Sequence, residues 1–391
     1  MKELEYPFDA AYIIKKRKSL KKALLADGTS RIRKKIAVLG GSTTSDIVKT
    51  LELFLLDAGI EPEFYESEYA QYFQDAMFPD ETLLSFKPDI VFIHTTNRNV
   101  TNWPEMTDTT EQIDEKLHAE INRFTAMWKS IAEKFHCPII QNNFEMPLYR
   151  LLGSRDAWDI HGRTNFLTRL NEAFYAYARE NESFYIHDLN FISADYGLKE
   201  WSNPLFWNMY KYAMCFEAIP SFAFSVSHII KSIFGKNKKA LALDLDNTLW
   251  GGVVGDDGVD GIEIGQETGV SQSYYEFQTY VKQLKSLGIV LTVCSKNDHE
   301  NAIAGLNHPE GALRPDDFVI IKANWENKDR NIAETAAELN ILPDSIVFAD
   351  DNPAEREIVR TQIKGAAVPD MDGVENYITT IDRSGFFEVT T

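Results

Sequence analysis

Short apolar runs that alternate with helical patterns limit this chain of 391 residues to an α/β fold. The runs are bounded by Gly, Pro, Asn or charged residues, as buried strands are, and cover residues 34–41, 88–96, 137–143, 240–246, 288–295, 317–322 and 345–351. Helical periodicity follows at residues 45–59, 112–135, 271–288, 298–306 and 328–340. Strands that alternate with helices in this way predict parallel, doubly wound sheets.

The chain is long for a single hydrophobic core. The polar stretch SIFGKNKK, residues 232–239, separates the first series of strands from the second. We therefore predict two α/β domains. Residues 1–235 would form a flavodoxin-like parallel sheet, and residues 236–391 a Rossmann-like domain.

Composition narrows the classes of protein that fit. No apolar run approaches the roughly 18–20 residues that cross a bilayer, so we predict no membrane span. The N-terminus lacks the pattern of a secretory signal. Cys137, Cys215 and Cys294 have no paired spacing, which is typical of a reducing cytoplasm.

The net charge of −19 argues against a general nucleic-acid binder. One segment departs from it, because residues 11–35 carry ten Lys and Arg and a single acid, Asp27. The segment could contact nucleic acid or a membrane surface, or it could be a solvated helix face. We favour the helix face, with Ile13, Ile14, Leu20, Leu24 and Leu25 packed inward.

Two pairs of acids end apolar strands in the second half. Asp244 and Asp246 close LALDLD, and Asp350 and Asp351 close SIVFADD. Side chains alternate along a strand, so Asp244 and Asp246 are expected to point the same way. Ligands of open α/β sheets bind at this end of the strands. Four carboxylates at one edge would repel each other without a cation, and hard oxygen ligands suit Mg²⁺.

Ser295 closes the strand GIVLTVCS, and Lys328 opens the helix KDRNIAETAAELN. A hydroxyl and an ammonium group are what a site needs to hold a transferring phosphoryl group.

In order, these motifs resemble those of the haloacid dehalogenase-like (HAD) phosphotransferase superfamily. The closest branch is the FkbH-like proteins, HAD phosphatase subfamily IIIC. The residues that carry the resemblance are KALALDLDNTLWGGVVGDDGVDGIEIG, TVCSKND, NWENKDRNI and VFADDNPAERE, which together span about residues 236–370.

The resemblance implies roles for single residues. Asp244 would be the nucleophile that forms an aspartyl-phosphate, and Asp246 the general acid and then base. Thr248 would steady the turn beside the phosphate. Ser295 would bind the phosphate oxygens with Asn297 nearby, and Lys328 would bridge the nucleophile and the phosphoryl group.

The resemblance also implies a metal site. Mg²⁺ would sit on Asp244, the backbone carbonyl of Asp246 and Asp351, with Asp350 as a ligand or in the second shell. A metal and a lysine would offset the repulsion between an anionic nucleophile and an anionic phosphate.

After the first acid pair, Trp250, Gly251 and Gly252 would let the backbone leave the sheet and form a mobile flap. The chain between motifs is too short for a large cap domain. We therefore expect an open site for a phosphorylated small molecule. The resemblance further implies a phosphorylated glyceryl unit that is loaded onto an acyl carrier protein. Cys294 is the nearest thiol in sequence, but we expect it to be buried and structural.

The first domain resembles an SGNH-type hydrolase. GGSTTSDIVKTL places Ser42 in the nucleophile position, and TTNRN places Asn97 or Asn99 in that family's Asn-bearing loop. However, Gly41 stands where the family has Asp, and no Asp-x-x-His follows. We therefore favour a degenerate SGNH-like domain that binds substrate or carrier. An esterase site at Ser42 is the alternative.

Overall fold

The structure is a computed structural model that describes residues 1–391, and its chain divides into two compact units. The N-terminal unit comprises residues 9–234 with 390–391, and the C-terminal unit comprises residues 235–389 with 1–8. These units differ from the predicted domains 1–235 and 236–391 at the two ends of the chain. The predicted boundaries stay a prediction about which segments fold on their own.

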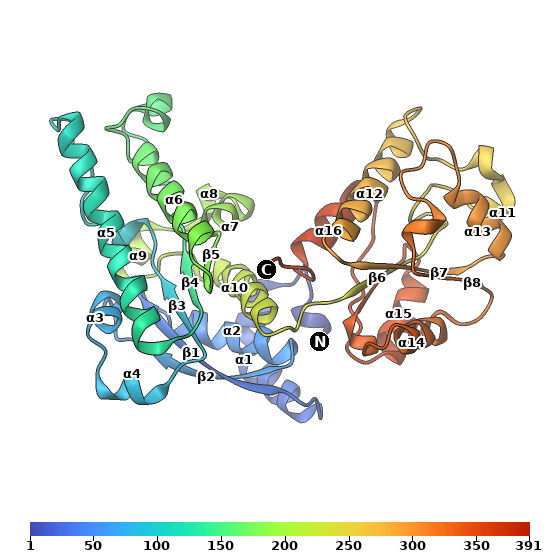
Figure 1. Ribbon diagram of the computed structural model, residues 1–391, viewed down its shortest axis with the longest axis horizontal. Helices are drawn as coiled ribbons and strands as arrows, with labels where there is room; N and C mark the ends of the chain where they lie inside the picture. The colour runs from blue at the N-terminus through green and yellow to red at the C-terminus, as the bar shows by residue number, and fades with distance from the viewer. The chain divides into compact units, whose positions relative to one another are not determined.

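Five parallel strands in the order β2-β1-β3-β4-β5 form the sheet of the N-terminal unit (Figure 1). They are β1 (Ile32–Gly40), β2 (Ile60–Glu66), β3 (Ile90–His94), β4 (Ile139–Asn142) and β5 (Phe184–His187). This confirms the α/β class. Strands β2 and β5 were not predicted from the sequence. In β2, glutamates and Pro62 interrupt the apolar pattern, which an edge strand tolerates.

Helices cover both faces of this sheet (Figure 1). They are α1 (Ala10–Ala26), α2 (Ser45–Asp57), α3 (Tyr72–Met77), α4 (Glu81–Phe86), α5 (Thr110–Phe135), α6 (Arg163–Glu180), α7 (Leu189–Tyr196), α8 (Leu198–Trp201), α9 (Pro204–Tyr210) and α10 (Ile219–Ile233). In the basic helix α1, Ile13, Leu20 and Leu24 are buried, while Ile14 is half-buried and Leu25 is exposed, against our expectation. Ile13, Leu20 and Leu24 lie on one face of the helix, and Leu25, one residue after Leu24, is turned about 100° away from that face.

Four parallel strands in the order β8-β7-β6-β9 form the sheet of the C-terminal unit. They are β6 (Ala240–Leu243), β7 (Val290–Lys296), β8 (Ile320–Asn324) and β9 (Ile346–Ala349). All four lie inside the predicted strand segments or within two residues of them. The confirmed architecture is thus two parallel sheets in a two-domain, Rossmann-like α/β fold.

The helices of this unit pack on opposite faces of the sheet (Figure 1). They are α11 (Val254–Asp257), α12 (Gly269–Ser286), α13 (His299–Leu306), α14 (Lys328–Glu338), α15 (Pro353–Gln362) and α16 (Tyr377–Arg383). Residues of α12, α13 and α16 pack with Leu241 and Leu243, and residues of α14 and α15 pack with Ala240 and Ala242. The alternation of side chains along β6 therefore builds two cores, one on each face.

The first eight residues belong to the C-terminal unit. Leu4 is buried, and Glu5 forms an ion pair with Arg360 of α15. Residues 1–8 thus pack against a unit whose other residues are more than 200 positions further along the sequence. As to membranes, none of the helices combines the length and apolar character that a span would require.

The connection from β6 to α12 lies where the flap is expected, and we call its residues 250–263 the flap. Gly251 and Glu263 close it through two backbone hydrogen bonds of 2.9 and 2.8 Å. Trp250 is fully buried, and its ring packs on Gly305 of α13, where an added Cβ would lie 2.5 Å from the ring.

We expect the substitutions Gly305→Ala and Gly269→Ala to have opposite effects on stability. Both glycines lie in helices, where alanine is ordinarily favoured by about 0.5–1 kcal/mol. Gly269 has open space at its Cβ position, so its substitution should be neutral or stabilising. At Gly305 the clash with Trp250 should instead lower the free energy of unfolding by about 1–3 kcal/mol. Urea unfolding of both variants checks this, and a stabilising Gly305→Ala would contradict the packing.

Candidate functional site

The candidate site lies where β6 and β9 end side by side. Leu243 of β6 is paired with Ala349 of β9, and the next residue, Asp244, donates its backbone N–H to the Ala349 carbonyl at 3.0 Å. Asp350 and Asp351 directly follow Ala349. The parallel pairing therefore brings together acids that are about a hundred residues apart in sequence.

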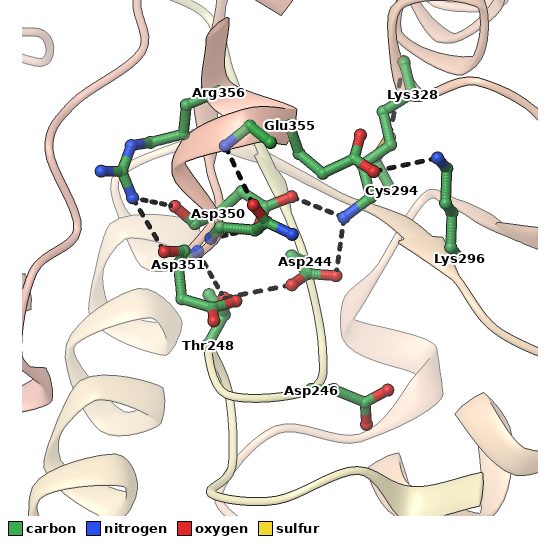
Figure 2. A network of polar contacts seen from close by, with 12 residues as sticks. Asp244, Asp246, Thr248, Cys294, Lys296, Lys328, Asp350, Asp351, Glu355 and Arg356 are labelled. Atoms are coloured by element: carbon green, nitrogen blue, oxygen red, sulfur yellow. Dashed lines mark hydrogen bonds and ion pairs between the residues drawn. The ribbon is translucent and has the colours of Figure 1, made fainter. Parts of the chain in front are cut away.

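These three acids form a cluster (Figure 2). One carboxylate oxygen from each of Asp244, Asp350 and Asp351 lies within 4.8 Å of the other two. Asp350 is fully buried, and Asp244 nearly so. The Thr248 hydroxyl lies between two of them, 3.4 Å from Asp244 Oδ2 and 3.2 Å from Asp351 Oδ1.

Lys328 is the first residue of α14, and its ammonium group enters the same cluster. Its Nζ atom lies 3.1 Å from Asp244 Oδ1 and 2.5 Å from Asp350 Oδ2, and its side chain is 4% exposed. Burial alone would lower the pKa of Lys328, but the Asp244 and Asp350 carboxylates outweigh it and raise that pKa. The lysine therefore stays charged.

One ammonium group does not balance three carboxylates in a buried place. Burial raises the pKa of Asp244 to about 6 in spite of Lys328. Burial, with the charge of Asp244, also raises the pKa of Asp350 to about 6. Three carboxylates and one ammonium group leave the ionised cluster with an excess of negative charge. Three carboxylate oxygens that converge where positive charge is lacking fit a hard divalent cation.

Asp246 lies apart from this cluster, contrary to the expectation that it points the same way as Asp244 (Figure 2). Its Oδ1 accepts the Trp250 indole N–H at 3.0 Å and the Val254 backbone N–H at 2.9 Å. Its Oδ2 accepts the amide of Asn297 at 2.9 Å. The strand ends at Leu243, and Asn247 adopts a φ of 60°, so strand alternation no longer governs residue 246.

The predicted phosphate-binding residues lie on β7 and just beyond it. Ser295 is a buried residue of β7, and Asn297 follows the end of that strand. Cys294 is buried as expected, and burial raises the pKa of its thiol to about 12. This thiol is therefore a poor nucleophile.

Two supports of the site carried no clear signal in the sequence. Arg356 donates one guanidinium nitrogen to the backbone carbonyls of both Asp350 and Asp351, each at 3.0 Å. The hydroxyl of Tyr377 donates to the Asn247 carbonyl at 2.9 Å. Tyr377 lies 130 residues further along the chain, and only the packing of α16 on the sheet places it there.

Ser42 follows β1 in the N-terminal unit, and its buried hydroxyl has no hydrogen-bond partner. The Asn99 amide donates to the Gly41 carbonyl at 2.9 Å. An added Cβ on Gly41 would lie 2.4 Å from the Asn99 side chain. The Asn97 backbone N–H donates to Glu145. Asn99 thus lies against the Ser42 loop, and its packing accounts for Gly41. No base activates the Ser42 hydroxyl.

Comparison with known proteins found one family and several solved structures. The family described as "FkbH, N-terminal domain" matches residues 35–231. The N-terminal part of the protein BF1531 from Bacteroides fragilis, described as containing a phosphatase domain complexed with Mg, is 31% identical. The match has a TM-score of 0.86 and covers 96% of this chain and 99% of that chain.

A putative acylhydrolase (BF3764) from Bacteroides fragilis is 16% identical, with a TM-score of 0.31, and covers 58% of this chain and 97% of that chain. At that TM-score the likeness supports no inference. No curated protein sequence matches the chain.

We expect no esterase activity from Ser42. Without a base its hydroxyl is a weak nucleophile, so release of acetate from an aryl acetate should stay at background. The Ser42→Ala variant serves as the blank. Activity that this substitution removes would restore the esterase interpretation.

We expect the metal-free protein to lose stability through Asp350 as the pH rises from about 4 to about 6. The pKa of Asp350 is above its ordinary value of 3.8 in the folded state, so the unfolded chain releases this proton first. Asp350→Asn stays neutral and avoids the loss. In EDTA, the free energy of unfolding of Asp350→Asn minus that of the natural chain should therefore grow by about 3 kcal/mol between pH 4 and pH 7. Urea titrations at both pH values measure it, and a constant difference would contradict the raised pKa.

Proposed function

Since the chain belongs to the FkbH family by its N-terminal domain, we propose that it is a Mg²⁺-dependent phosphatase or phosphotransferase of the FkbH type. The chemistry would reside in the C-terminal unit and follow the haloacid dehalogenase-like pattern. The observation that carries the proposal is the cluster of Asp244, Asp350 and Asp351, in which the two buried acids, Asp244 and Asp350, form ion pairs with Lys328. The phosphatase domain of the Bacteroides fragilis relative, crystallised with Mg, supports it.

Asp244 is the nucleophile in this proposal. Its carboxylate forms a bond to phosphorus while the bond from phosphorus to the leaving oxygen breaks, which gives an aspartyl-phosphate. Lys328 contacts Asp244 Oδ1 at 3.1 Å, so its charge is close to both the nucleophile and the arriving phosphoryl oxygens. Water or another acceptor then attacks phosphorus and releases Asp244.

Asp246 moves the protons. It gives a proton to the leaving oxygen in the first step and takes one from the attacking water in the second. Its carboxylate is free of the acidic cluster, which is the separation that two carboxylates with different tasks need.

Asp244, Asp351 and the backbone carbonyl of Asp246 would hold Mg²⁺, with Asp350 as a further ligand or behind the ligands. When bound, the ion would neutralise negative charge on the phosphoryl group. Arg356 supports this arrangement, because it fixes the backbone of both acids that follow β9.

Phosphate binding is assigned to Thr248, Ser295 and Asn297. Thr248 already contacts Asp244 and Asp351, so it is close to the reacting group. Asn297 donates to Asp246 in this structure, so any bond to phosphate would compete with that contact.

The substrate would be a phosphorylated small molecule. The site fits a short phosphoryl ester or acyl phosphate of the glyceryl type, with an acyl carrier protein as acceptor of the remaining unit. Cys294 is buried and would not accept that unit. The N-terminal unit, with its unactivated Ser42, would bind substrate or carrier.

We expect Mg²⁺-dependent release of phosphate from an aryl phosphate, and its loss in Asp244→Asn. Removal of the nucleophile should lower kcat by about a thousandfold or more, and EDTA should abolish the activity. Ser42→Ala is the matched control and should retain the natural rate. Full activity of Asp244→Asn, or activity in EDTA, would contradict the proposal.

A further inference from the structure

The carboxylate of Asp246 is held on three sides by N–H donors. Trp250 and Val254 donate to Oδ1, at 3.0 and 2.9 Å, and Asn297 donates to Oδ2 at 2.9 Å. No carboxylate or hydroxyl shares these contacts. Oδ1 is saturated by two donors, so Oδ2 keeps the free lone pair that can carry a proton.

Trp250 can serve as a fixed donor because its ring cannot move. The side chain is fully buried and packs closely against the backbone of Gly305 on α13. A rigid ring holds its indole N–H in one place, and so holds the carboxylate that accepts from it.

The same contacts join Asp246 to the flap. Trp250 and Val254 both belong to the flap. A further hydrogen bond holds the start of the flap, since the Gly252 N–H donates to Asn247 Oδ1 at 2.8 Å. Asn297 comes from the other side, beyond β7. Asp246 is therefore clamped between the flap and the end of a neighbouring strand.

We propose that Trp250 and Asn297 are positioning residues that orient the Asp246 carboxyl group for proton transfer to the leaving oxygen. This inference rests on the proposed function. In the step, the O–H bond at Asp246 Oδ2 breaks and a new O–H bond forms on the leaving oxygen, which receives the electron pair of the broken P–O bond. In this inference Trp250 and Asn297 act through their hydrogen bonds to Asp246, and this role replaces the phosphate-binding role given to Asn297 above.

This role makes the effect of a substitution depend on the leaving group. A nitrophenolate leaves as a stable anion and needs little help from an acid, whereas a phenolate needs a proton. The value of kcat/KM reports the steps up to transfer of phosphorus to Asp244, so it isolates the acid from the later base.

Trp250→Phe keeps the ring and removes the indole N–H. We expect it to lower kcat/KM for phenyl phosphate by about tenfold or more and for 4-nitrophenyl phosphate by less than about threefold. Asn297→Leu removes the other side-chain donor and should give the same selective loss. If Asn297 bound phosphate instead, both substrates would lose equally.

Trp201→Phe is the matched control. Trp201 is a buried tryptophan of the N-terminal unit whose indole nitrogen has no hydrogen-bond partner, so its substitution should leave the ratio of the two kcat/KM values unchanged. Calorimetric titration with Mg²⁺ should give the same affinity for Trp250→Phe and the natural chain, because the acidic cluster is untouched.

The outcomes separate the two proposals. Equal losses on both esters, or no loss on either, overturn the positioning role while the phosphatase stands. No phosphate release by the natural chain from either ester overturns the proposed function, and the positioning role with it. If Trp250→Phe does not fold, as judged by circular dichroism, Asn297→Leu decides alone.

Discussion

The ion pairs of Lys328 with Asp244 and Asp350 are the interaction on which the rest of the site depends. A buried lysine is costly unless carboxylates surround it, and two buried carboxylates are costly unless a cation lies between them. Here the two carboxylates raise the pKa of Lys328 and keep it charged, and with Asp351 the cluster holds three carboxylates for one ammonium group. The site is thus built with room for one more positive charge.

The two acids of the first motif, Asp244 and Asp246, have different surroundings. Asp244 lies in a cluster with two more carboxylates, and Asp246 accepts N–H donors from three other residues. Two residues separated by one position in sequence thus acquire different electrostatic environments. Both acids lie beyond the end of β6 at Leu243, where the regular alternation of a strand no longer sets the direction of their side chains.

The sequence was enough to predict the class of fold and the edge of the sheet where the acids meet. Both follow from local patterns, since the strands are apolar and the acids come directly after them. It also predicted the approach of Lys328, through the resemblance to a known order of motifs. The roles assigned to these residues remain predictions.

Three features could not be predicted from the sequence. Strand β2 was missed because its glutamates mask the apolar pattern. The predicted direction of the Asp246 side chain was wrong because β6 ends three residues earlier, at Leu243. Arg356 and Tyr377 act on backbone carbonyls, and such contacts depend on how a helix packs rather than on any motif.

The packing of residues 1–8 into the C-terminal unit has a consequence for synthesis on the ribosome. Glu5 is translated 355 residues before Arg360, its ion-pair partner. The unit that carries the acids cannot complete this contact until residue 360 has been translated. The N-terminal sheet, whose strands are all made by residue 187, can form long before that. Nascent chains would therefore pass through a stage in which the N-terminal sheet is folded and residues 1–8 have not yet met the residues they pack against.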